Sequence, residues 1–308
     1  MDALHGFTRG LDYPSIVAAS ERVAWSVNQI FDGRLFDASK PIVPASWVGT
    51  AHLDFLDTRD QCTLNHCRAF SYVHLIGNLE EFVTPHLADM VRDGCHDDRG
   101  QLRALLRFGE EELKHQQLFA RAERVLEASC GYAFTRYFDA DKLVIRGLTN
   151  AILGHAPLPI FLMALAFELG TQRHYVESIR DRRGVDPLYV DVLRAHWVEE
   201  AQHTKCDLLE VSRLSRGMSD VALARACDDV RSLGALVDAV FRGQADGEID
   251  TLRRVTGRAL AEPERVALHD ALHTSLGAIM AGVGLGHPTF VQVVRELSSS
   301  GATALGLA

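Results

Sequence analysis

The strongest constraint on this chain is a short metal-binding pattern that occurs twice, in two segments that are both predicted to be helical. The first is the pair Glu112 and His115, and the second is the pair Glu200 and His203. Residues three apart share one face of an α-helix, with Cβ atoms about 5–6 Å apart. His196 precedes Glu200 by four residues and extends the second pair along that face. Two such helices, with one glutamate from each of two others, form a dinuclear site inside a four-helix bundle.

The apolar residues recur at helical spacing in four segments that can supply this bundle. We expect these helices over residues 60–92, 101–129, 157–182 and 187–214. Further helices are expected over residues 15–31, 219–242, 250–260 and 262–297, with an extended loop over 37–47 and a loose tail over 298–308.

No segment shows the alternation of a strand, so the predicted fold is all-α: a four-helix bundle with additional flanking helices. We expect a single domain over residues 1–308. Residues 1–59 would form an N-terminal helix and arm, residues 60–216 the metal-binding bundle, and residues 217–308 the C-terminal helices and tail.

The first metal-type pair lies on the apolar face of its predicted helix. Leu105, Phe108 and Phe119 bracket Glu112 and His115 at helical spacing, so this face is expected to point into the core. One such pair would fit a solvated helix surface. A buried carboxylate without a partner is costly, however, and a bound cation removes that cost. Because the pattern occurs on two helices, a dinuclear metal site is favoured over chance alignment.

Each of the two remaining bundle helices must supply one glutamate, and the sequence offers two candidates on each. On the first helix, Glu80 lies close to the apolar stripe, whereas Glu81 faces largely away from it. On the third helix, Glu168 stands in an otherwise uncharged apolar run, whereas Glu177 has the charged neighbours of a solvated surface. We prefer Glu80 and Glu168, and Glu81 and Glu177 remain the alternatives.

The predicted ligand set contains four carboxylates and three imidazoles: Glu80, Glu112, His115, Glu168, His196, Glu200 and His203. Such a set suits two iron ions, with manganese or a mixed iron–manganese pair as alternatives, and does not select zinc or copper. The third histidine adds a neutral donor to one ion and should alter how that ion binds oxygen species. We expect no catalytic residue beyond these ligands.

Carboxylates that orient the ligating imidazoles are expected around such a site. Glu111 and Glu199, each adjacent to a proposed ligand, could instead be surface residues or exchange roles with their neighbours. The histidines outside the motifs are expected to be mostly surface groups or groups that support the ligands; these are His66, His74, His86 and His174.

Composition excludes several other classes of protein. A net charge of −9 disfavours nucleic-acid binding, which needs a basic surface. The N-terminus lacks the features of a signal peptide, and the longest apolar run is far shorter than the about 20 residues that span a bilayer. The six cysteines include no Cys-x-x-Cys pair, so reduced thiols in a cytoplasm are expected and a cysteine zinc site is not.

The order of the proposed ligands resembles that of the non-haem diiron N-oxygenases related to p-aminobenzoate N-oxygenase. The shared ligands would be Glu80, Glu112, His115, Glu168, Glu200 and His203, and His196 would be the additional histidine that two-histidine diiron proteins lack. The resemblance covers about residues 70–210 and transfers no substrate-contacting residue. It implies a ferritin-like fold, a homodimer, and a monooxygenase that uses O2 and an external electron donor. Through a peroxo-diiron species, such an enzyme oxidises an amine, typically an arylamine, towards the hydroxylamine or nitro level.

Three other functions compete with this expectation. A diiron C–H hydroxylase or oxidative-cleavage enzyme would use the same ligands on another organic substrate. A non-catalytic ferritin-like protein would bind iron for storage or protection, although the helices after residue 216 argue against a minimal storage subunit. A helical interaction protein without a metal is the remaining alternative.

Overall fold

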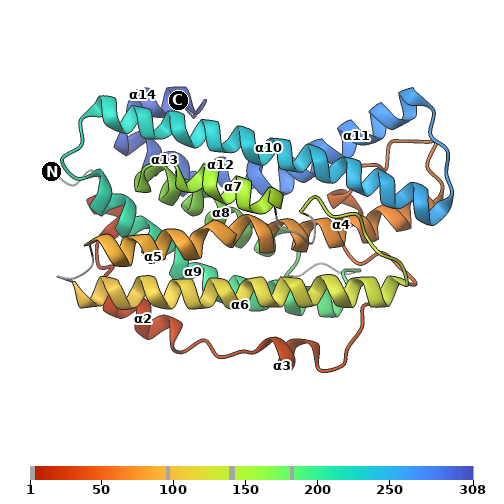
Figure 1. Cartoon of the computed structure of the whole chain (residues 1–308), viewed down its shortest axis with the longest axis horizontal. Helices are drawn as coiled ribbons and strands as arrows, with labels where there is room; N and C mark the ends of the chain where they lie inside the picture. Colours follow the sequence, from red (N-terminus) through yellow and green to blue (C-terminus); the bar gives the residue numbers. More distant parts are fainter. Residues whose placement is uncertain (1–3, 95–97, 139–142, 181–183, 308) are drawn as a thin grey trace.

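The computed structural model describes residues 4–94, 98–138, 143–180 and 184–307, and these residues form helices joined by loops, with no strand among them. The predicted all-α bundle is confirmed. Its long elements run side by side in Figure 1. They are α4 (Thr58–Leu79) continued by α5 (Val83–Gly94), α6 (Arg99–Cys130), α8 (Pro157–Ser178) and α9 (Pro187–Ser215).

Three of the predicted bundle helices agree closely with the structure, and the fourth contains a break. The expected unbroken helix over residues 60–92 tightens into a 3-10 turn, η2 (Glu80–Phe82), between α4 and α5. Pro85 explains this break, because proline has no N–H to bond the carbonyl four residues earlier and its ring crowds that carbonyl. The turn falls on Glu80, one of the predicted ligands.

The predicted helix over residues 15–31 is wrong, because this segment forms two short helices. They are α2 (Tyr13–Ser20) and α3 (Val27–Phe31), and the still shorter α1 (His5–Thr8) precedes them. Ser26 starts α3 with a capping box, in which its side chain accepts from the Gln29 backbone and the Gln29 side chain accepts from the Ser26 backbone. That reciprocal cap begins a new helix instead of continuing the old one. The expected loop over residues 37–47 is present and ends in the 3-10 turn η1 (Ala45–Trp47).

The two helices predicted over residues 219–242 and 250–260 are one helix, α10 (Asp220–Thr256). Glycines suggested a break here, but they serve close packing. A Cβ atom on Gly243 would lie 2.0 Å from the ring of Tyr137, and one on Gly247 would lie 3.3 Å from Thr135. The loop that follows α6 therefore lies directly on these glycines. α10 runs along one edge of the molecule in Figure 1.

The C-terminal region is more ordered than predicted. The helix expected over residues 262–297 is divided into several elements, and the expected loose tail forms a packed helix. Ala302 is buried, and a Cβ atom on Gly301 would lie 2.6 Å from Cys227 Sγ. The sequence reasoning also missed α7 in the segment before α8. That helix is α7 (Leu143–Leu153). The C-terminal elements are α11 (Glu262–Gly277), the π-helical turn η3 (Ala278–Gly282), α12 (Val283–Leu285), α13 (Pro288–Leu297) and α14 (Ser299–Ala304).

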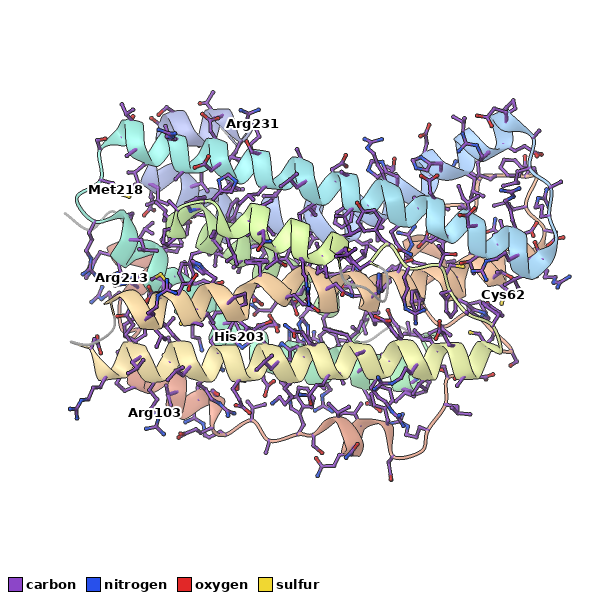
Figure 2. All side chains as sticks on the ribbon, viewed as in Figure 1. Cys62, Arg103, His203, Arg213, Met218 and Arg231 are labelled. Atoms are coloured by element: carbon purple, nitrogen blue, oxygen red, sulfur yellow. The ribbon has the colours of Figure 1, made fainter. Side chains whose placement is uncertain are left out.

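Apolar side chains fill the space between the helices on both sides of the ligand positions. Figure 2 shows His203 inside the molecule, whereas Arg103 and Arg231 lie at its edges. Among the described helices, none is by itself long and apolar enough to cross a membrane. The segments Glu262–Leu285 and Pro288–Leu297 meet the criteria of length and composition only as a pair, which is bent by 52°.

We predict that Gly284→Ala destabilises the fold, because a Cβ atom there would lie 2.1 Å from the backbone carbonyl oxygen of Ala166 in α8. Backbone cannot yield as a flexible side chain does, so the free energy of unfolding should fall by about 1–3 kcal/mol. Gly277→Ala is the control, since nothing lies within 4 Å of its Cβ position. It should be neutral or add up to about 1 kcal/mol. Denaturant unfolding measures both, and equal effects would contradict this packing.

Candidate metal centre

The structure brings the seven predicted ligands together in the middle of the bundle. Each bundle helix contributes to the cluster, and each of the seven residues is at most 4% exposed. The contributions are Glu80 from η2, Glu112 and His115 from α6, Glu168 from α8, and His196, Glu200 and His203 from α9.

Glu200 lies at the centre of the cluster. Its Oε1 atom is 2.9 Å from His196 Nε2, 3.3 Å from His115 Nδ1 and 3.7 Å from His203 Nδ1. Glu112 approaches the same ligands from α6, with Oε1 2.9 Å from His203 Nδ1 and 3.8 Å from His115 Nδ1. A carboxylate placed between imidazoles in this way can bridge two cations. The donor atoms of Glu112, His115, Glu200 and His203 all lie within 4.8 Å of one another.

The outer ligands make the two halves of the cluster unequal. Glu80 Oε1 lies 3.4 Å from His196 Nε2, and the donor atoms of Glu80, His115 and His196 are within 4.8 Å of one another. Glu168 Oε1 lies 3.8 Å from His203 Nδ1 on the other side. The half with Glu80 therefore has two histidines, His115 and His196, and the half with Glu168 has His203; His115 also lies within reach of Glu112, Glu200 and His203. The additional histidine, His196, belongs to the first half.

Each of the seven residues has a buried atom that could bind a metal and that has no hydrogen-bond partner among the described residues. These atoms are Glu80 Oε2, both carboxylate oxygens of Glu112 and of Glu200, His115 Nδ1, Glu168 Oε2, His196 Nε2 and His203 Nδ1. Leaving a buried polar atom unpaired costs about 1–3 kcal/mol, and more when it is charged. So many unpaired atoms pointing at one place are explained if cations bind there. The residues fit a pair of divalent ions, since four carboxylates carry the charge that two such ions neutralise.

The carboxylates next to Glu112 and Glu200 orient the histidines of the opposite helix. His115 Nε2 lies 3.0 Å from Glu199 Oε2, and His203 Nε2 lies 3.2 Å from Glu111 Oε2. An imidazole that donates from Nε2 to a carboxylate presents an unprotonated Nδ1 to a metal. α6 and α9 are therefore joined twice by the same interaction, in which a glutamate of one helix contacts a histidine of the other.

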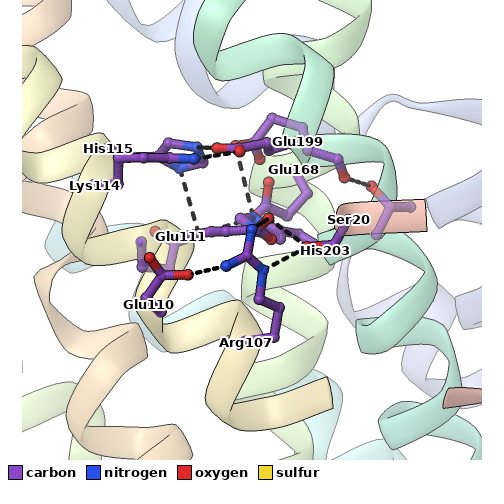
Figure 3. A network of polar contacts seen from close by, with 12 residues as sticks. Ser20, Arg107, Glu110, Glu111, Lys114, His115, Glu168, Glu199 and His203 are labelled. Atoms are coloured by element: carbon purple, nitrogen blue, oxygen red, sulfur yellow. Dashed lines mark hydrogen bonds and ion pairs between the residues drawn. The ribbon is translucent and has the colours of Figure 1, made fainter. Parts of the chain in front are cut away.

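Glu111 and Glu199 are thus not surface residues, since both are buried, and each contacts a histidine on its Nε2 side. Each also has a cation of its own: Arg107 Nη2 lies 3.3 Å from Glu111, and Lys114 forms an ion pair with Glu199 (Figure 3). The sequence contained a signal for these two supporting carboxylates, because in both motifs a second glutamate directly precedes the ligand glutamate.

For His203, the neighbouring Glu200, Glu111 and Glu112 outweigh burial and raise the pKa well above its ordinary value. Burial shifts the pKa values of Glu80, Glu112, His115 and His196 away from the charged forms. It raises the pKa of Glu80 well above its ordinary value, with Glu112 and Glu200 adding repulsion, and raises the pKa of Glu112 to about 7. It lowers the pKa of His196 to about 3 and that of His115 well below its ordinary range, because neighbouring imidazoles also disfavour a positive charge there. Neutral imidazoles are the form that binds metal, whereas the carboxylates must release protons to do so.

The rival glutamates lie outside the cluster. Glu81 is half-buried and lines a cavity between α4 and α6, and Glu177 is exposed and paired with Arg173. The four histidines expected to be mostly surface or supporting groups are all buried. His174 Nδ1 contacts the Tyr72 hydroxyl at 2.8 Å, and the remaining three are His66, His74 and His86.

Sequence reasoning missed one further carboxylate. Asp207 follows His203 by one helical turn on the same face of α9, and it is completely buried. Neither of its oxygens has a hydrogen-bond partner among the described residues. Burial raises its pKa, and the charge of His203 lowers it. The spacing of four residues from His203 was the signal in the sequence.

No family model, curated protein or solved structure matches the chain. The resemblance to the diiron N-oxygenases therefore stays a prediction. The chemistry of the centre follows from its own buried carboxylates and imidazoles, which are compatible with a metal site.

We predict that the metal-free protein loses stability as the pH rises above about 6.5. Glu80 and Glu112 have raised pKa values, so the folded chain holds protons that the unfolded chain has already released. The stability therefore falls with rising pH until the folded chain has released these protons as well. The lowered pKa values of His115 and His196 act in the opposite direction, but only below the ordinary histidine value. Thermal unfolding at about pH 6.5 and about pH 8 measures the effect.

Bound metal should reverse this dependence, because protons then compete with the cation for the carboxylates. Metal affinity should therefore fall as the pH decreases below about 7. The prediction for the metal-free protein would be contradicted if its unfolding temperature rose between about pH 6.5 and about pH 8.

We also predict that Glu199→Gln weakens metal binding by about 10–100-fold, since removing the carboxylate charge makes His115 a poorer ligand. The matched control is Glu110→Gln, which replaces a glutamate of α6 whose side chain is 59% exposed. Competition with a chromophoric chelator measures the affinity of each variant. Equal affinities in the two variants would show that Glu199 does not orient a ligand.

Proposed function

We propose that the chain is an O2-dependent non-haem diiron oxygenase that oxidises the nitrogen of an amine substrate. The observation that carries this proposal is the convergence of seven buried side chains, each with an unpaired donor atom, on one place in the bundle. Their mixed carboxylate and imidazole chemistry suits iron, with manganese as the alternative. Two bound iron ions would supply the redox chemistry that activates O2.

The residues of the chain would support the reaction in three ways: they hold the ions, orient the histidines and exclude water. Glu112 and Glu200 lie among the imidazoles of the cluster and would hold the ions there. Glu111 and Glu199 keep the Nδ1 atoms of His203 and His115 free for binding. The apolar side chains around the cluster exclude bulk water, which would otherwise compete for open coordination positions and quench reactive species.

The choice of nitrogen as the atom oxidised is supported by the third histidine. His196 places a second imidazole beside Glu80 in one half of the cluster, and this asymmetry is the feature shared with the N-oxygenase pattern. A neutral donor in place of an anionic one leaves that half less electron-rich, which alters how it binds oxygen species. C–H hydroxylation and oxidative cleavage use the same metals and differ in the substrate.

We predict that the protein loaded anaerobically with ferrous iron holds about two ions per chain. Its absorption spectrum should change when O2 is added. Glu200→Ala should lose most of the iron, because this residue contacts three of the ligating imidazoles. His196→Ala should retain iron but change the spectrum that follows O2 addition. Metal analysis and stopped-flow absorption measure these results.

His52→Ala is the control for the histidine variant, because His52 is exposed in a loop outside the bundle. Iron content well below two per chain, or no spectral response to O2, would refute the proposal. A substrate screen read by mass spectrometry separates the oxygenase reactions, since oxygen gained on carbon instead of nitrogen supports the hydroxylase alternative. Very high iron loading in a cage-sized assembly would instead support storage.

A further inference from the structure

Trp25 connects the N-terminal arm to the candidate metal centre. It lies between α2 and α3, and its ring is parallel to that of His115, with an interplanar angle of 1° and 6.2 Å between ring centroids. This distance and angle describe an offset stack. The Nε1 atom of Trp25 has no hydrogen-bond partner among the described residues, so stacking and packing hold the indole in place.

The same indole is tied to the residues that orient His115. The Lys114 ammonium lies 4.2 Å from the centroid of the Trp25 ring, which is a cation–π contact. Lys114 also pairs with Glu199, which accepts from His115 Nε2. Trp25 therefore contacts the ligand through its ring and contacts the cation that neutralises the carboxylate behind that ligand.

Trp25 also lines a cavity that opens to the surface. The cavity has a volume of about 450 Å³ and lies between the arm and α9. Gln29 and Arg194 line it and are exposed, whereas Trp25 is half-buried. A molecule in this cavity would touch Trp25, and Trp25 is stacked on a ligand of the centre.

The other two tryptophans are placed differently. Trp197 stacks on Tyr175, with 5.1 Å between centroids, and Trp47 lies against Tyr72 and His174. Among the ring contacts of the described residues, neither of them touches a ligand of the candidate centre. This difference supplies a matched control within the same chain.

We propose that Trp25 is the residue through which electrons enter the centre, passing from a one-electron donor bound at this cavity to the ion held by His115. The inference rests on the proposed function. Such a route is needed because the ligands are at most 4% exposed, so a bulky donor cannot reach the ions directly. In each event the donor loses one electron and a ferric ion gains it, and two events return both ions to the ferrous state. No bond forms or breaks, and Trp25 and His115 end each event unchanged.

The test compares the reduction rates of iron-loaded, oxidised protein in four forms: wild type, Trp25→Phe, Trp25→Leu and Trp197→Phe. Each is mixed anaerobically with reduced methyl viologen, and the loss of the colour of the donor is followed. Trp25→Phe should be several-fold slower than wild type, because the smaller phenyl ring connects the cavity less closely to His115. Trp25→Leu, which has no ring, should be slower still, and Trp197→Phe should match wild type.

Equal rates in wild type and both Trp25 variants, at equal iron content, would overturn the inference and leave the proposed function intact. Loss of iron from Trp25→Phe would also overturn it, because Trp25 would then only position His115. Failure of the wild type to bind iron would refute the proposed function first.

A second readout needs no reductant: iron should quench the tryptophan emission of wild type and Trp197→Phe, and much less that of Trp25→Phe. Equal quenching in Trp25→Phe would show that Trp25 is not coupled to the centre.

Discussion

The fold depends on one electrostatic constraint: four carboxylates lie together in the middle of an apolar bundle. Ions taken out of water without compensation cost several kcal/mol each. The raised pKa of Glu80 and the lowered pKa of His196 are the response of the metal-free chain. A pair of divalent cations would remove this cost, and the unpaired donor atoms lie where such cations would bind.

The supporting residues show how a bundle can hold such a cluster in a defined geometry. α6 and α9 each present a ligand glutamate preceded by a second glutamate, and each second glutamate binds the histidine of the opposite helix. This exchange couples the rotation of one helix to that of the other. Arg107 and Lys114 then compensate the two supporting carboxylates at the outer edge of the bundle. Lys114 also contacts Trp25, which brings the N-terminal arm into the same network.

The errors of the sequence reading have specific physical causes. Periodicity alone indicated a continuous helix across Glu80, but Pro85 removes a backbone donor and tightens the chain into a 3-10 turn there. Gly243 was taken as part of a helix break, although it lies inside α10 because the Tyr137 ring occupies the space of a side chain. The cap at Ser26 was a local signal that could have separated α2 from α3.

The sequence by itself determined the all-α fold and the helical faces that carry the ligands, because hydrophobic periodicity and the spacing of Glu and His depend on local helix geometry alone. It also distinguished Glu80 and Glu168 from Glu81 and Glu177. Only the tertiary structure decided which histidine each supporting carboxylate binds and that the half with two histidines lies beside Trp25. These contacts join residues distant in the chain, such as Trp25 and His115, and they depend on the rotation and packing of whole helices.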